Sequence, residues 1–322
     1  MVEWYHWAGF LVLLVAILAV DLGVLHRDAH EVPFREAVAW TGAWVALAAG
    51  FGAVLWIWQG APVAAEYLAG YMIEWSLSID NVFVFVLLFG AFAVPSQYQH
   101  RVLFWGVIGA IALRLTFILV GSALLHRFDW MVFVFGGMLI LTAIRLLRER
   151  ADPRTIHDSR LLTLVRRILP LTDEYQGQAL TANVHGQRMA TPLLAVLVMI
   201  ELTDLVFAID SVPAVFSVTR NAFVAFTSNA MAILGLRALY FVLSGAIGRF
   251  RYLKLALVAI IAFVGVKMIL SHWVEVPITL SLGAIAGALA VGIAASLLSS
   301  RPRVLHTGDQ RSASKTSDPG NT

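Results

Sequence analysis

The sequence predicts an all-α membrane protein, a polytopic bundle of transmembrane helices. Hydrophobic residues make up 60% of its 322 residues and charged residues only 13%, against about 45–50% and about 25% in soluble domains. Apolar stretches of about 20 residues recur along the chain, each long enough to cross a hydrocarbon core of roughly 30 Å. The net charge of +3 comes from Lys and Arg mainly in loops and at helix ends, where they set topology, so no nucleic-acid partner is predicted.

Hydropathy and its polar interruptions predict nine spans. They cover residues 5–25, 37–58, 65–91, 102–125, 129–147, 192–216, 222–247, 253–272 and 276–298. The first span has neither a preceding basic region nor an A-x-A site, so we expect a retained helix and not a signal peptide. An external N-terminus places most of the 23 Lys and Arg residues in the cytoplasm. The positive-inside rule therefore predicts that the N-terminus lies outside and the C-terminus inside.

We expect residues 1–300 to form one transmembrane domain with a cytoplasmic connection at 148–191. Within that connection, residues 158–169 include an amphipathic stretch that is typical of a helix lying on the inner membrane surface. A helix that binds a partner or regulates the protein is the alternative. Residues 301–322 are polar and almost without apolar side chains, so this tail is predicted to be disordered.

A motif in the third span recurs in the sixth. The acidic pairs have the same spacing and are Glu74 with Asp80, and Asp204 with Asp210. Arg114 and Arg237 lie in the middle of the spans that follow. Spans 3–5 and 6–8 therefore resemble two copies of a three-helix unit, and an odd number of spans gives the copies opposite orientations. Inverted repeats of this kind place the substrate site near the membrane midplane.

Five acidic side chains lie deep inside the predicted spans: Glu74, Asp80, Glu201, Asp204 and Asp210. At about 2.5–3.5 kcal/mol each on insertion scales, five unpaired charges would cost about 12–18 kcal/mol if additive, so they must face the bundle interior. Helical periodicity puts Glu74 on one face with Ser78 and Asn81. The sixth span has an equivalent stripe: Glu201, Asp204, Ala208 and Ser211. Pro213 should kink that helix and free backbone carbonyls.

These acids have a structural and a functional interpretation. The structural one is a buried salt-bridge network in which Arg114 and Arg237 are fixed countercharges. Five carboxylates against two guanidinium groups leave three negative charges, so we expect protons or a bound divalent cation as well. Asn81 and Ser211 would add neutral oxygen ligands. Asp21, near the inner end of the first span, is either a further ligand or an interfacial capping residue.

The donor atoms narrow the choice of ion. The chain has no cysteine, and none of its nine histidines lies centrally in a span. Oxygen ligands alone favour Mg²⁺, Ca²⁺ or Mn²⁺ over zinc and copper, and they leave the choice among the three open. We expect no prosthetic cofactor and no enzymatic activity. An intramembrane aspartyl protease with Asp80 and Asp210 as its dyad is disfavoured, because the sequence lacks the Gly-x-Gly-Asp signature expected there.

Several long motifs indicate a family. The stretches at 21–32, 74–85, 99–106, 171–175 and 201–214 resemble the TerC/Alx family of bacterial integral membrane proteins. The resemblance implies a manganese exporter in the bacterial inner membrane, in a family named for tellurium resistance. By this resemblance, the functional acids of the family correspond to the five acidic residues named above, and Asn81 is an extra ligand. Export of Mn²⁺ in exchange for protons is the expected function. The alternative is a scaffold, assembly or stress-response factor that transports nothing.

Overall fold

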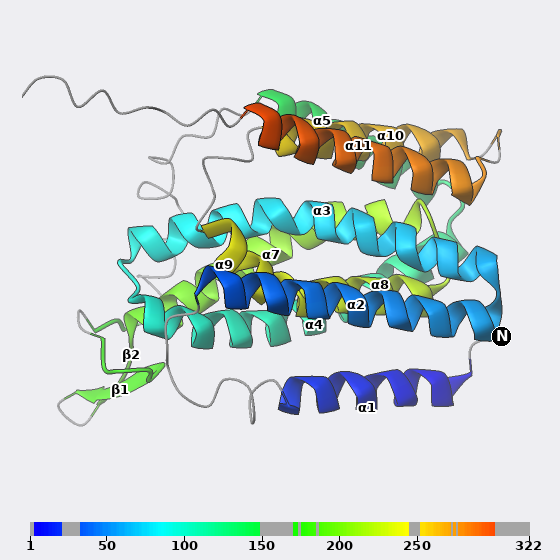
Figure 1. Ribbon diagram of the computed structural model, residues 1–322. Coiled ribbons are helices and arrows are strands. Elements are labelled where there is room, and N and C mark those ends of the chain that lie inside the picture. The colour runs from blue at the N-terminus through cyan, green and yellow to red at the C-terminus, as the bar shows by residue number, and fades with distance from the viewer. Residues whose placement is uncertain are drawn as a thin grey trace, which may run out of the picture.

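The computed structural model describes residues 3–20, 33–148, 170–172, 175–184, 187–244, 252–271, 273–274 and 276–299. Its longest helices lie with their axes roughly parallel (Figure 1). The described helices are α1 (Trp4–Val20), α2 (Phe34–Gln59), α3 (Ala61–Ala91), α4 (Ser96–Arg127), α5 (Met131–Arg148), α7 (Pro192–Phe216), α8 (Ala222–Leu234), α9 (Leu236–Ser244), α10 (Leu253–Leu270) and α11 (Ile278–Ser299). The predicted class, a helical membrane protein, is confirmed.

The helices form two packed groups. Helices α3, α4, α7 and α8 make the centre of the larger group, while α5, α10 and α11 lie together on one side (Figure 1). Helices α5 and α10 approach closely at Gly136 and Gly265, where a Cβ on Gly136 would lie 3.0 Å from the Gly265 carbonyl oxygen. Small residues at a helix crossing allow this approach, which makes α5 and α10 a tightly packed pair.

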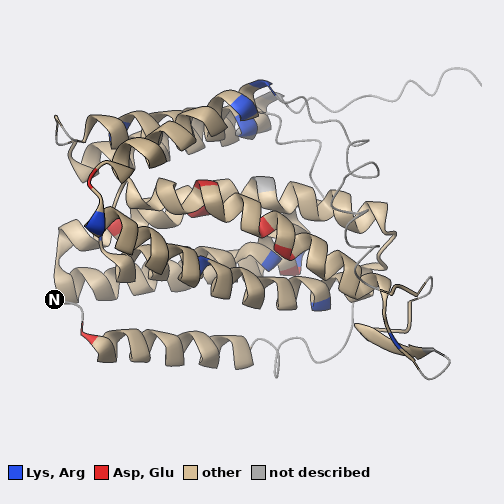
Figure 2. Ribbon diagram, turned by 180° about the vertical axis from the view of Figure 1, so that it is seen from behind, with Lys and Arg blue, Asp and Glu red and all other residues tan. Residues whose placement is uncertain are grey.

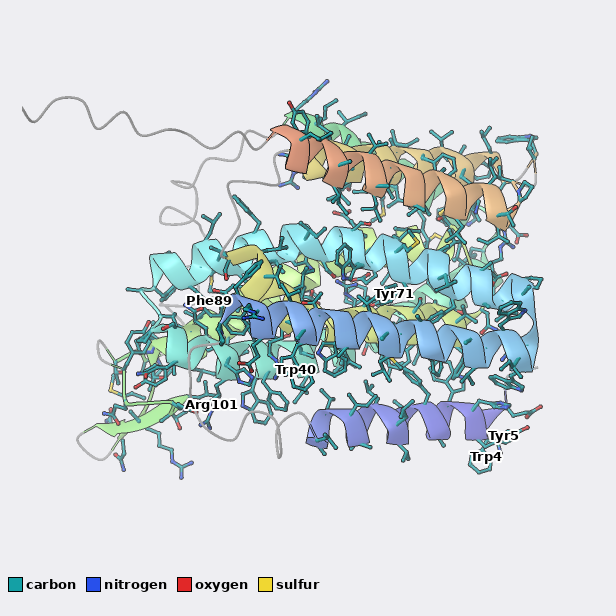
Figure 3. All side chains as sticks on the ribbon, in the orientation of Figure 1. Trp4, Tyr5, Trp40, Tyr71, Phe89 and Arg101 are labelled. Atoms are coloured by element: carbon teal, nitrogen blue, oxygen red, sulfur yellow. The ribbon has the colours of Figure 1, made fainter. Side chains whose placement is uncertain are left out.

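Helix α1 packs through aromatic side chains. The ring of Phe10 lies 5.4 Å from that of Phe51 and 5.7 Å from that of Phe226, centroid to centroid. Trp4 and Tyr5 are exposed at the start of α1, at one end of the bundle (Figure 3). Aromatic residues in such a position are typical of a membrane interface.

Six helices of the described chain are long and apolar enough to cross a membrane, or seven if the bent pair α8–α9 counts as one span. Helix α1 is apolar but has only 17 residues. Each predicted span nevertheless corresponds to a helix or to the α8–α9 pair. That the chain crosses the membrane nine times, and that it contains an inverted repeat, both stay predictions.

The seventh predicted span, 222–247, is not one straight helix. It bends by 40° between α8 and α9, at Gly235. Glycine is a weak helix former, and a Cβ at this position would lie 3.4 Å from the Cβ of Trp44 on α2. The close approach of α2 therefore accompanies the break.

Pro213 lies in the last turn of α7, which runs on to Phe216.

A β-hairpin precedes α7 within the connection that sequence analysis assigned to the cytoplasm. Strands β1 (Thr181–Val184) and β2 (Gln187–Ala190) pair antiparallel, and the sequence did not indicate them. Tyr175 donates its hydroxyl to the Phe92 carbonyl oxygen at 2.6 Å, which attaches this segment to the α3–α4 turn. Burial raises the pKa of the Tyr175 phenol, so it stays a donor at neutral pH. The amphipathic segment 158–169 and the tail 301–322 lie outside the described residues.

Candidate functional site

The polar stripes predicted on α3 and α7 both face the protein interior. On α3, Glu74, Ser78 and Asn81 are at most 2% exposed, and on α7 Asp204 and Ser211 are equally buried. Charged positions are few along the helices, and several of them lie in the middle of the bundle (Figure 2). Ala208 of the predicted α7 stripe is buried as well, whereas Glu201, its first member, is only partly buried.

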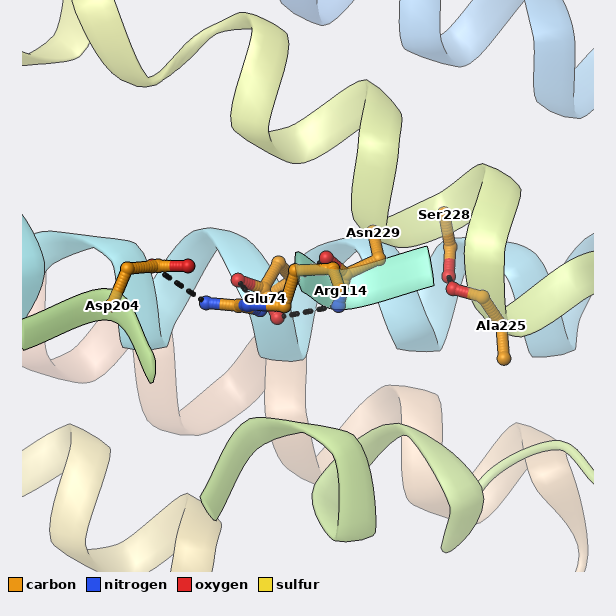
Figure 4. Close-up of polar contacts among 6 residues, drawn as sticks. All are labelled: Glu74, Arg114, Asp204, Ala225, Ser228 and Asn229. Carbon is orange, nitrogen blue, oxygen red and sulfur yellow. Dashed lines mark hydrogen bonds and ion pairs between the residues drawn. The ribbon is translucent and has the colours of Figure 1, made fainter. Parts of the chain in front are cut away.

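A buried ion-pair network joins four helices at the centre of the bundle (Figure 4). Arg114 of α4 donates to Glu74 of α3 through one terminal nitrogen and pairs with Asp204 of α7 through the other, at 3.3 Å. Asn229 of α8 donates its amide to the Glu74 Oε2 at 2.8 Å and accepts from Arg114 at 3.3 Å. One guanidinium thus faces two carboxylates. With all three ionised, the network carries one net negative charge.

Four buried oxygens of the same two stripes have no hydrogen-bond partner among the described atoms. They are Ser78 Oγ, Asn81 Oδ1, Asp204 Oδ2 and Ser211 Oγ. An unsatisfied buried polar group costs about 1–3 kcal/mol, and native proteins contain few of them. All four belong to the buried stripes of α3 and α7, two helices that pack against each other.

A cavity of about 130 Å³ adjoins the network. It lies where the two helix groups meet, and its lining comes from α3, α4, α5, α7 and α10: Leu77, Asn81, Arg114, Thr142, Arg145, Leu146, Val206, Phe207, Asp210, Ser211 and Ile261. Thr142 of α5 donates its hydroxyl to Asp210 Oδ1 at 2.7 Å. The cavity therefore combines a carboxylate, two guanidinium groups and the unpartnered oxygens of Asn81 and Ser211.

The remaining predicted residues are distributed differently. Arg237 is buried on α9 and lines a small apolar cavity of about 10 Å³ together with Asp204. Glu201 is partly exposed, and its carboxylate lies against Gly109 of α4, where a Cβ would collide with it. Asp21 and the side chain of Asp80 lie outside the described residues.

The five acids consequently do not form one observed cluster. Within the described residues, no group of three or more His, Cys, Asp or Glu side chains is arranged to hold a metal ion. Glu74 and Asp204 share Arg114, while Asp210 lies on the neighbouring cavity. The cavity is lined by oxygen-bearing side chains of both kinds, the acidic Asp210 and the neutral Asn81 and Ser211.

Sequence reasoning missed two contributors to the site, Asn229 and Thr142, and one polar contact elsewhere, that of Glu66. Asn229 was detectable, because a lone amide inside an apolar helix is expensive in a membrane and points to a polar contact. Thr142 had no signal, since a threonine hydroxyl can equally bond within its own helix. Glu66 of α3 accepts from Thr219 at 2.6 Å and lies near enough to Lys267 of α10 for electrostatic interaction. That contact is separate from the central network.

Fold and site together define a multi-pass helical membrane protein with a buried polar centre. The family model described as "Integral membrane protein TerC family" matches residues 59–304, so the chain belongs to this family. It is 47% identical over 92% of both chains to the uncharacterized membrane protein STKORF319 of Myxococcus xanthus. It is also 41% identical to the putative membrane-bound redox modulator Alx of Escherichia coli K12, over 88% of this chain and 91% of that protein. No solved structure matches.

Proposed function

We propose that this protein exports a divalent metal cation, Mn²⁺, across the bacterial inner membrane. The observation that carries the proposal is the cavity between the helix groups, which Asp210 lines together with the unpartnered oxygens of Asn81 and Ser211. These oxygens are not expected at a position that serves packing alone, because a buried polar atom without a hydrogen-bond partner is unfavourable. A cation that gives up part of its hydration shell would bind these oxygens and so provide the partner that they lack.

The donor atoms suit a hard cation. Carboxylate, amide and hydroxyl oxygens bind Mg²⁺, Ca²⁺ and Mn²⁺, whereas zinc and copper prefer nitrogen and sulfur. The chain contains no cysteine, so it supplies no thiolate ligand. Membership of the TerC family, together with the manganese export that the motif resemblance implies, favours Mn²⁺ among the three.

Transport requires that the site open to each side in turn, as in other bundles with a site at mid-depth. We assign the external side to the N-terminus by the charge distribution in the loops. Arg114 would compensate one of the two negative charges of Glu74 and Asp204 while no metal is present. Protons entering from outside would compete with the metal for the carboxylates, promote its release and return inward, which couples export to the proton gradient.

Reconstitution tests the proposal directly. Purified protein in vesicles that contain a manganese-sensitive dye should admit Mn²⁺, and the isosteric changes Asp204→Asn and Asp210→Asn should abolish that flux while the protein still folds. Asp129→Asn is the matched control, because Asp129 is exposed in the turn between α4 and α5. Absence of flux with the native protein, or full flux in both Asp204→Asn and Asp210→Asn, would refute the proposal. Flux that does not respond to a pH gradient would refute proton coupling alone.

A further inference from the structure

A polar cluster at one end of the bundle connects the two helix groups. Thr219, in the turn between α7 and α8, donates its hydroxyl to Glu66 Oε2 of α3 at 2.6 Å. Lys267 of α10 is only 8% exposed, and Glu66 interacts with it electrostatically. Because α10 packs tightly on α5 through Gly265 and Gly136, the cluster links this pair of helices to the larger group.

The cluster lies between the cavity of about 130 Å³ and the end of the bundle that carries the N-terminus (Figure 1). The helices concerned each supply a lining residue to that cavity: Leu77 of α3, Ser211 of α7 and Ile261 of α10. At 1.5 Å per residue along a helix, Glu66 lies about 16 Å from Leu77, and Lys267 about 9 Å from Ile261, both toward that end. The charge distribution in the loops assigns this end to the outside.

The turn between α7 and α8 holds Glu66 in position. The backbone amide of Asn221 donates to Thr219 Oγ1 at 3.2 Å, and the Asn221 side chain caps α8 by accepting from the Phe223 amide at 3.0 Å. The Thr219 hydroxyl thus accepts from this turn and donates to Glu66. The carboxylate therefore has a fixed orientation on the larger group, opposite Lys267 of the α5–α10 pair.

A charged contact of this kind suits a part of the protein that closes and opens. Taking two opposite charges out of water costs about as much as their attraction returns, so a buried ion pair contributes little net stability. When the two helix groups separate, water reaches both side chains and compensates for the lost contact. An apolar contact would gain nothing from that water. The charged pair can therefore hold the closed form without preventing its opening.

We propose that Glu66, Thr219 and Lys267 form the outer gate of the transport path. While Lys267 lies opposite Glu66, the α5–α10 pair stays against the larger group at the outer end, and the cavity is closed to the outside. Separation of Lys267 from Glu66 opens the cavity for release. This inference rests on the proposed function, because it names the contact that controls access to the same cavity.

Thiol labelling measures the opening of the outer gate without any metal. Because the chain has no cysteine, Leu77→Cys places a single reporter in the cavity lining. A charged, membrane-impermeant thiol reagent is applied to right-side-out vesicles, and the labelling rate is compared among gate variants in this background. They are Lys267→Met, Glu66→Gln and the charge exchange Glu66→Lys with Lys267→Glu. Lys254→Met is the matched control, because it removes a lysine from the first turn of the same helix.

The reporter should be labelled slowly when the native Glu66 and Lys267 are present. Lys267→Met and Glu66→Gln should each raise the labelling rate by about 5-fold or more, the lower limit of a typical coupling between two states. The charge exchange should restore slow labelling because it re-forms the pair, and Lys254→Met should leave the rate unchanged. A reporter introduced as Asp129→Cys, exposed in the turn between α4 and α5, should be labelled fast with every gate variant.

Fast labelling of Leu77→Cys with the native pair present, or unchanged rates in both single variants, would overturn the inference. Fast labelling in the charge-exchanged protein would overturn it as well, since the two charges would then not act as a pair. These outcomes are independent of Mn²⁺ flux, because the labelling needs no metal. Absence of Mn²⁺ flux with the native protein is a separate result, and it refutes the proposed function.

Discussion

Removing the central guanidinium should destabilise the protein more than neutralising Glu74, one of its two acidic partners. Arg114 is 1% exposed and lies between two buried carboxylates, those of Glu74 and Asp204. Arg114→Met leaves two buried negative charges with no cationic partner in the network. Loss of one member of a buried ion pair typically costs about 3–5 kcal/mol, because the remaining charge stays desolvated. We expect a loss in that range or above it.

The matched change Glu74→Gln should be milder. It leaves Arg114 paired with Asp204 in a network of zero net charge, and the new amide oxygen can accept from one of the two donors that Glu74 now satisfies. The expected loss is about 1–3 kcal/mol, which is typical of a lost hydrogen bond to a charged group. The double variant, Arg114→Met with Glu74→Gln, has one buried negative charge without a cationic partner in place of two. It should therefore be more stable than Arg114→Met alone.

Unfolding in detergent, followed by tryptophan fluorescence at a fixed heating rate, gives the required ranking. All four proteins are compared at the same pH, and abundance in the membrane provides an independent measure. The reasoning would be refuted if Arg114→Met were as stable as Glu74→Gln. It would also be refuted if adding Glu74→Gln to Arg114→Met caused a further loss, since the charges would then not be coupled as the geometry requires.

Three further predictions concern packing and topology. Gly136→Ala should destabilise the protein by about 1–3 kcal/mol through overpacking, because its Cβ would lie 2.6 Å from a side-chain carbon of Ile269; Gly137→Ala, with open space at its Cβ, should be neutral in the same thermal assay. Reporter fusions after Arg150 and after Arg303 should both indicate the cytoplasm, and an external signal at either would reverse the predicted topology. Neutralising both arginines within 161–169 should weaken surface association without changing Mn²⁺ flux, and loss of flux in folded protein would contradict a peripheral role.

The helices were predictable because apolar length is a property of each segment alone. Their ends were less so: α4 begins at Ser96, ahead of the predicted span from residue 102. The bend at Gly235 coincides with the approach of Trp44 from a different helix, and that approach is not visible in the local sequence. The β-hairpin before α7 has strands of only four residues each, too short for alternation to identify.

The same distinction applies to the site. Helical periodicity placed Glu74, Asn81, Asp204 and Ser211 on buried faces, because the angle between residues of one helix is fixed. Periodicity says nothing about how one helix is rotated against another. The sequence therefore indicated Arg114 as a countercharge without indicating which acids it would contact. The contacts of Asn229 and Thr142 became visible only with the tertiary packing.

The position of the cavity connects the candidate site to the mechanism that we propose. Its lining comes from α3, α4 and α7 on one side and from α5 and α10 on the other, so it lies on the boundary between the two helix groups. The close glycine contact between α5 and α10 makes separation within that pair less favourable than movement of the pair against α7. A cation bound to Asp210 would therefore lie where such a movement changes access. Because Thr142 joins Asp210 to α5, the hydrogen bond between these two residues would have to lengthen or break during that movement.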